Sequence, residues 1–229
     1  MSVLAALVDL VLPRRCIGCG SALGALCPAC LPEGAPCRGA AGAWAAGVYE
    51  AAIRSALLAY KERGRRDLAR PLGELLGRAV GCALAPGRSP PGRVVLASVP
   101  SARSASAARG GAHVLRLARH AARSNGVRVA PDALRLTRQV ADSAGLSTDE
   151  RARNLANAMT AAPAPPGLVA IIVDDIVTTG ATLREARRAM VAAGWPVLGA
   201  AAVAATPRRG HSLSFPLASP ATRTSVIKT

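Results

Sequence analysis

Residues 171–182 read IIVDDIVTTGAT: an apolar run, two adjacent carboxylates, then small hydroxyl residues around one glycine. The apolar run begins at Val169 and is short and rich in β-branched residues, which is typical of a buried strand in a parallel sheet. Residues 181–194 then place apolar side chains on one stripe and end at a glycine, which predicts a helix. A second apolar run, residues 196–203, follows at once. The order predicts strand, loop, helix and strand, a right-handed crossover in a parallel sheet.

The loop of this unit lies at the predicted carboxyl end of a strand, where open α/β sheets bind their ligands. Backbone N–H groups at the start of a helix are unpaired, and they favour a phosphate. The hydroxyls of Thr178, Thr179 and Thr182 add donors. Gly180, next to Ala181, lets the backbone close around the anion. The loop therefore predicts a phosphate site.

Asp174 and Asp175 stand beside that predicted site, and their charge would repel a phosphate. Carboxylates accept hydrogen bonds, so we expect them to hold vicinal sugar hydroxyls, directly or through a hydrated Mg²⁺. A 5-phosphorylated ribose fits both halves of the stretch. The alternative is a strand end with an aspartate cap before an ordinary helix.

The stretch resembles the signature of type I phosphoribosyltransferases, which replace the pyrophosphate of 5-phosphoribosyl-1-pyrophosphate (PRPP) with a nucleophile. The resemblance implies an α/β fold with a central, mainly parallel sheet flanked by helices. It also implies that PRPP binds with Mg²⁺, that the two acids hold the ribose hydroxyls in catalysis, and that the loop holds the 5-phosphate. The residues that take these roles by resemblance are Asp174, Asp175, Thr178, Thr179, Gly180, Ala181 and Thr182.

A second buried strand is predicted at residues 94–99, and a loop of small residues with Arg103 and Arg109 follows it. An arginine-bearing loop after a parallel strand is a candidate anion site at the same sheet edge, and pyrophosphate is its expected occupant. The next helix carries His113 and His120, which are too far apart for a metal pair. We expect both to be surface or packing residues.

Two helices are predicted before this point, at residues 51–62 and 67–84. Between them basic residues gather around Gly64; we expect a solvated junction, with a phosphate or nucleic-acid contact as the alternative. Residues 134–158 are polar, and their composition suits either a mobile flap over the site or an ordinary loop. The basic residues of the junction are Lys61, Arg63, Arg65, Arg66 and Arg70.

The amino-terminal region carries two C-x₂-C pairs, formed by Cys16, Cys19, Cys27 and Cys30. Four thiolates complete a tetrahedral Zn²⁺ site with no open position, so the zinc is predicted to be structural, with reduced or redox-active pairs as the alternative. Cys37 and Cys82 have no matching partner, and we expect them to be packing residues.

The chain of 229 residues has a net charge of +16, which favours phosphorylated ligands, nucleic acid or other acidic partners.

Its apolar amino terminus lacks the basic start of a signal sequence, and no run is long enough for a membrane span, so we expect a cytoplasmic protein. Three parts are predicted: an amino-terminal helix with the zinc module, a phosphoribosyltransferase-like domain and a disordered tail. They span residues 1–40, 41–206 and 207–229.

The whole arrangement is similar to the ComF/GntX family of competence-associated proteins. The resemblance runs from about Cys16 to Ala205 and includes Tyr60-Lys61, Val99-Pro100, Arg109-Gly110 and the central signature. It implies phosphoribosyl transfer to an unidentified acceptor, linked to DNA uptake. The alternative is a non-catalytic adaptor for competence or replication restart that binds single-stranded DNA or the proteins that handle it. The sequence leaves the acceptor and the oligomeric state open.

Overall fold

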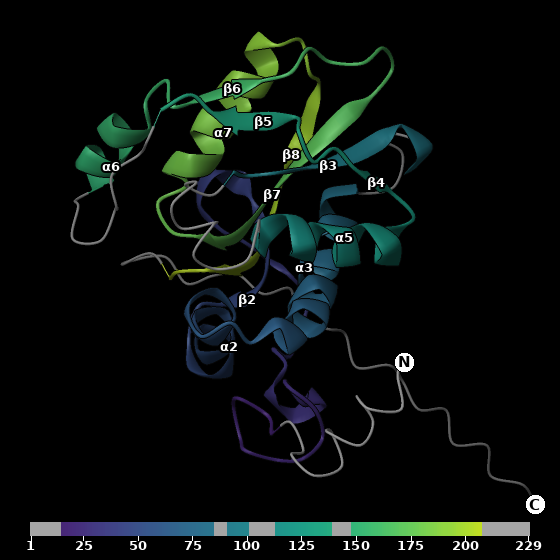
Figure 1. Ribbon diagram of the computed structural model, residues 1–229, viewed down its shortest axis with the longest axis vertical. Helices are drawn as coiled ribbons and strands as arrows, with labels where there is room; N and C mark the ends of the chain where they lie inside the picture. Colours follow the sequence, from purple (N-terminus) through teal and green to yellow (C-terminus); the bar gives the residue numbers. More distant parts are fainter. Residues whose placement is uncertain (1–14, 85–90, 101–112, 139–147, 208–229) are drawn as a thin grey trace, which may run out of the picture.

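A six-stranded sheet forms the centre of the computed structural model, which describes residues 15–84, 91–100, 113–138 and 148–207 (Figure 1). The strand order is β1-β2-β8-β7-β3-β4, and every neighbouring pair is parallel except β1 with β2. The predicted mainly parallel α/β fold is therefore confirmed. The strands are β1 (Cys37–Arg38), β2 (Trp44–Val48), β3 (Val94–Ser98), β4 (Arg128–Val129), β7 (Val169–Val177) and β8 (Val197–Ala205).

Strand β7 lies between β8 and β3 and is longer than the sequence predicts, because it continues through both acids to Val177. Strand β8 is the cause: Asp174, Ile176 and Val177 pair with Ala202, Ala204 and Ala205. The acids are thus fixed on a sheet ladder rather than on a loop.

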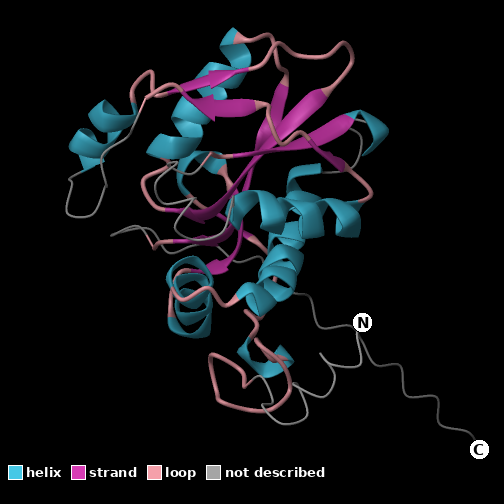
Figure 2. Cartoon of the chain, viewed as in Figure 1, coloured by secondary structure: helices cyan, strands magenta, loops and turns pink. Residues whose placement is uncertain are grey.

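Helices cover both faces of the sheet (Figure 2). One face packs against α2 (Ala51–Glu62), α3 (Ala69–Leu84) and α5 (His113–Asn125) in a core that includes Ile171 and Val173. The other face packs against α7 (Ala181–Ala192) in a second core that includes Ala170 and Ile172. Successive residues of β7 therefore face opposite layers, as strand geometry requires. The predicted helix at residues 51–62 is confirmed, and the one predicted at 67–84 is split into the short 3₁₀ turn η3 (Arg66–Leu68) and α3.

A two-stranded antiparallel sheet of β5 (Leu134–Leu136) and β6 (Met159–Ala161) lies beside α7. Glu185 of α7 accepts a hydrogen bond from the Met159 amide at 3.1 Å, and Arg188 donates to the Met159 carbonyl at 2.9 Å. The indole of Trp195 donates to the Ala162 carbonyl at 2.7 Å. The segment predicted as a flap or loop, residues 134–158, thus contains β5 and α6 (Thr148–Leu155) and leads directly into β6, which pairs with β5.

The cysteine-bearing segment lies at one end of the molecule, beside α2 (Figure 1). Its only described regular elements within residues 15–43 are β1 and two 3₁₀ turns, η1 (Pro28–Cys30) and η2 (Ala40–Gly42). A short 3₁₀ turn, η4 (Pro91–Arg93), precedes β3. Among the described helices, none has the length and apolar character needed to cross a bilayer.

Candidate functional site

The loop from Thr178 to Gly180 joins β7 to α7 at the carboxyl edge of the sheet. Gly180 is the residue before the helix and has φ +78°, in the left-handed region. A Cβ at this position would lie 2.8 Å from the Cβ of Ala41 and 3.1 Å from its backbone nitrogen. Two features therefore require glycine at this position: the left-handed backbone angle, and the closeness of η2, which leaves no space for a side chain.

This loop leaves the first amides of α7 directed away from the helix body. The Thr179 hydroxyl lies 3.4 Å from the Ala181 nitrogen, a long and weak hydrogen bond. Arg184 donates to the Thr179 carbonyl at 3.0 Å, which fixes the turn and places a cation within the first turn of the helix. Thr178 is exposed, and Thr179 and Thr182 are half-buried. The arrangement leaves N–H and O–H donors together at the start of α7.

The two acids of β7 are buried and have different surroundings. Asp175 is 4% exposed, and its Oδ2 lies 2.6 Å from Lys61 Nζ and 2.9 Å from His113 Nε2. Asp174 is 9% exposed, and its Oδ1 accepts a hydrogen bond from the Asp175 amide at 2.8 Å. One acid is therefore held by side chains of the helical layer and the other by its own strand.

These surroundings move the pKa values of the two carboxyls in opposite directions. Burial disfavours the charge on Asp175, but the charge of Lys61 and the hydrogen bond from His113 outweigh it and lower the pKa to about 2. Burial and then the negative charge of Asp175 raise the pKa of Asp174 to about 8. The buried pair therefore favours one ionised carboxyl over two.

The structure places Lys61 and His113 differently from what the sequence predicts. Lys61 was expected at a solvated junction, and His113 as a surface or packing residue; both instead contact Asp175. A signal for each was present, because Lys61 is four residues beyond the buried Leu57 and His113 is four residues before the buried Leu117. Both stand on the apolar stripe of a helix, where a polar side chain needs a partner.

Two further residues of the basic junction are paired within the chain. Arg65 contacts Asp67 at 2.7 Å, and Arg70 contacts Glu74 at 2.9 Å. The junction is therefore not a cluster of five solvated cations, and it offers less to a polyanion than the sequence suggests. Arg103 and Arg109, predicted to contact pyrophosphate, lie outside the described residues.

The sulfur atoms of Cys16, Cys19, Cys27 and Cys30 all lie within 4.8 Å of one another. Zinc–sulfur bonds of about 2.3 Å in a tetrahedron place the sulfurs about 3.8 Å apart, so the cluster fits one such ion. Cys19 and Cys27 Sγ are 3.5 Å apart, and the Gly18 and Cys27 amides donate to Cys16 Sγ at 3.4 and 3.3 Å. The four cysteines predicted as ligands are brought together, and they can hold a metal ion such as zinc.

The protonation of the cluster also suits a cation. Burial opposes ionisation of Cys16, but amide donors led by Cys27 outweigh it and lower its pKa to about 6. Burial, and then contacts with the other thiols, raise the pKa of Cys30 to about 12. Four thiolates this close repel one another unless a positive ion lies between them. Cys37 is fully buried in the second core, as expected for a packing residue, and Cys82 is partly buried.

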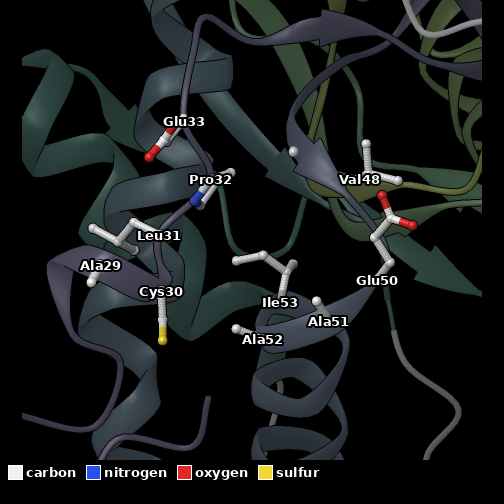
Figure 3. A pocket seen from close by; sticks show the side chains of 11 residues that line it. Ala29, Cys30, Leu31, Pro32, Glu33, Val48, Glu50, Ala51, Ala52 and Ile53 are labelled. Atoms are coloured by element: carbon white, nitrogen blue, oxygen red, sulfur yellow. The ribbon is translucent and has the colours of Figure 1, made fainter. Parts of the chain in front are cut away.

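A pocket of about 400 Å³ lies between the cysteine module and the start of α2 (Figure 3). Leu31 and Pro32 line one side and Ile53 the other, with the carboxylates of Glu33 and Glu50 in the lining. None of the residues predicted to bind PRPP lines it. The pocket is therefore separate from the β7–α7 loop and lacks the cationic donors that a phosphorylated ligand needs.

Comparison with known families agrees with this geometry. Residues 114–221 match the family model of the phosphoribosyl transferase domain. The chain has no match among curated protein sequences. The matched region contains the acid pair, the loop and α7, all at the carboxyl edge of β7.

Proposed function

We propose that the protein binds PRPP with Mg²⁺ at the β7–α7 loop and transfers its phosphoribosyl group to a small nucleophilic acceptor. The observation that carries the proposal is the placement of an acid pair and a helix amino terminus at one sheet edge, inside the region that matches the phosphoribosyl transferase domain. Sugar hydroxyls need acceptors and a phosphate needs donors, and this edge supplies both.

In this proposal each group of the loop has a separate task. The amides at the start of α7 and the hydroxyls of Thr178, Thr179 and Thr182 bind the 5-phosphate. Asp174 and Asp175 accept hydrogen bonds from the ribose hydroxyls or from water on the metal. Bound Mg²⁺ would neutralise charge on the departing pyrophosphate. The protein contributes orientation and electrostatic stabilisation, and no side chain forms a covalent bond to the sugar.

The four-cysteine module has a structural role in this proposal. We propose zinc as its ion, because the four sulfurs leave no coordination position for a substrate. The module packs against α2 through Gly18, where a Cβ would lie 2.7 Å from Cys30 Sγ and 2.8 Å from the Ala52 Cβ. The ion therefore fixes the segment beside the helix that carries Lys61.

Calorimetric titration of zinc-loaded protein with PRPP tests the first step. We expect saturable binding of one PRPP per chain that weakens when Mg²⁺ is chelated. Ribose 5-phosphate should compete, because it carries both the phosphate and the hydroxyls. If folded protein, as judged by circular dichroism, gives no heat of binding at millimolar PRPP, the proposal is wrong.

A further inference from the structure

The contacts to Asp175 converge on one of its two oxygens. Lys61 Nζ and His113 Nε2 both bind Oδ2, at 2.6 and 2.9 Å. Within the described ranges 15–84, 91–100, 113–138 and 148–207, no ammonium or N–H donor reaches Oδ1. A carboxylate has acceptor capacity on both oxygens, so Oδ1 keeps lone pairs that a further donor can use.

We propose that Lys61 and His113 are positioning residues that hold Oδ2 of Asp175 and so direct Oδ1 toward a hydroxyl of the bound ribose. The inference rests on the proposed function, since it assigns new residues to the same site. Neither residue lies in the region that matches the phosphoribosyl transferase domain, which begins at Val114. Helix α2, through Lys61, and the first residue of α5, His113, thus contribute to the sugar contact.

The histidine is itself fixed from two sides. The Tyr60 hydroxyl donates to the His113 carbonyl at 3.0 Å, and the two rings meet edge to face with centroids 6.4 Å apart. Tyr60 is 5% exposed, so this contact lies in the core between α2 and α5. Because Asp175 is ionised, its oxygen can only accept, and His113 must donate from Nε2. The imidazole orientation and its protonated nitrogen are both specified.

The cation that binds Asp175 is a lysine, and lysine is rare in this chain. Of the 29 basic residues, 27 are arginine by count, and the lysines are Lys61 and Lys228. An ammonium is a compact point charge that can lie against one carboxylate oxygen, whereas a guanidinium prefers to bind both oxygens of a carboxylate at once. Lysine therefore suits a contact that must leave Oδ1 open.

The test measures the recognition of sugar hydroxyls rather than affinity alone. Parent protein and variants are titrated with ribose 5-phosphate and with its 2-deoxy and 3-deoxy analogues, with folding checked by thermal denaturation. The parent should prefer ribose 5-phosphate over at least one analogue by about tenfold or more, the loss of one hydrogen bond to a charged group. Lys61→Met and His113→Leu should reduce that preference to within about threefold. Arg70→Met removes an equal charge from an exposed pair and should leave it unchanged.

Lys61→Met leaves a buried carboxylate without its cation and can fail to fold. The double variant Lys61→Met with Asp175→Asn removes that charge, and it should match Asp175→Asn alone in hydroxyl preference. A folded Lys61→Met that keeps the parent's preference overturns the inference, and so does one that weakens all three sugars equally. A parent that binds none of the sugars and no PRPP overturns the proposed function as well.

Discussion

The cysteine module and the carboxyl edge of β7 both gather groups that suit an ion, but the two regions differ in what holds those groups in place. The four cysteines lie on a segment whose regular structure is one three-residue 3₁₀ turn at Pro28–Cys30. Asp174 and Asp175 lie on a nine-residue strand with hydrogen-bonded neighbours on both sides. We therefore expect the first region to need a metal ion to keep its shape, and the second to keep its shape without a ligand because the sheet holds it.

Removal of the metal should have the largest effect, and only on the module. Replacing Cys27 by Ser, or adding a strong chelator, removes binding energy that in small zinc modules is about 10–16 kcal/mol and is the energy of folding. We expect residues 16–31 to lose their protection from hydrogen exchange while β7 and α7 keep theirs. Cys37→Ser is the matched control, because Cys37 is a buried cysteine outside the cluster. Equal loss of protection in β7 after chelation would show that the two regions are one cooperative unit.

Gly180→Ala should give the next largest effect and should act on the loop. Left-handed backbone costs an alanine about 1–3 kcal/mol, and the new Cβ would also lie 2.8 Å from that of Ala41. The control is Gly126→Ala, since Gly126 has φ +63° but open space around a Cβ. We expect Gly180→Ala to be the less stable variant in urea and to be the only one of the two that loses PRPP affinity. Matching behaviour of the two variants would show that the contact with Ala41 does not shape the loop.

The third prediction concerns the acids, whose replacement should act chiefly on PRPP binding. Replacing both Asp174 and Asp175 by Asn keeps their size and turns acceptors into mixed donors. PRPP affinity should fall at least tenfold, about 1.4 kcal/mol, as measured by calorimetry. The loop from Thr178 to Gly180 is unchanged in this variant, so we expect weak competition by inorganic phosphate to persist. Undiminished PRPP affinity would identify the acids as structural groups that only stabilise the end of β7.

The sequence predicted the parts of the molecule that depend on local pattern. The unit from β7 to β8 and the helix α2 follow from apolar spacing and glycine positions, and the four cysteines follow from their repeat. Strand β2 was missed because five residues, WAAGV, gain strand structure only by pairing with β8, more than 150 residues later. The hairpin of β5 and β6 was missed for a similar reason, since each strand has three residues.

The candidate site shows the same division. The acids and the loop could be predicted because they are adjacent in sequence and their chemistry is complementary to a phosphorylated sugar. Lys61 lies 114 positions before Asp175, and nothing local indicates that the two meet. Their contact follows from the packing of α2 and α5 on one face of the sheet, which only the folded chain specifies.

The central claim is that the edge of β7 binds the phosphoribosyl ligand and the cysteine module does not. Backbone amide spectra of isotope-labelled, zinc-loaded protein, recorded during titration with PRPP and Mg²⁺, test it most directly. We predict saturable shifts at the amides of Thr179, Gly180, Ala181 and Thr182 and at Asp175, with residues 16–31 unaffected. Shifts centred on the pocket beside Ile53 and Leu31, or a loop whose amides do not respond at saturating PRPP, would contradict the account.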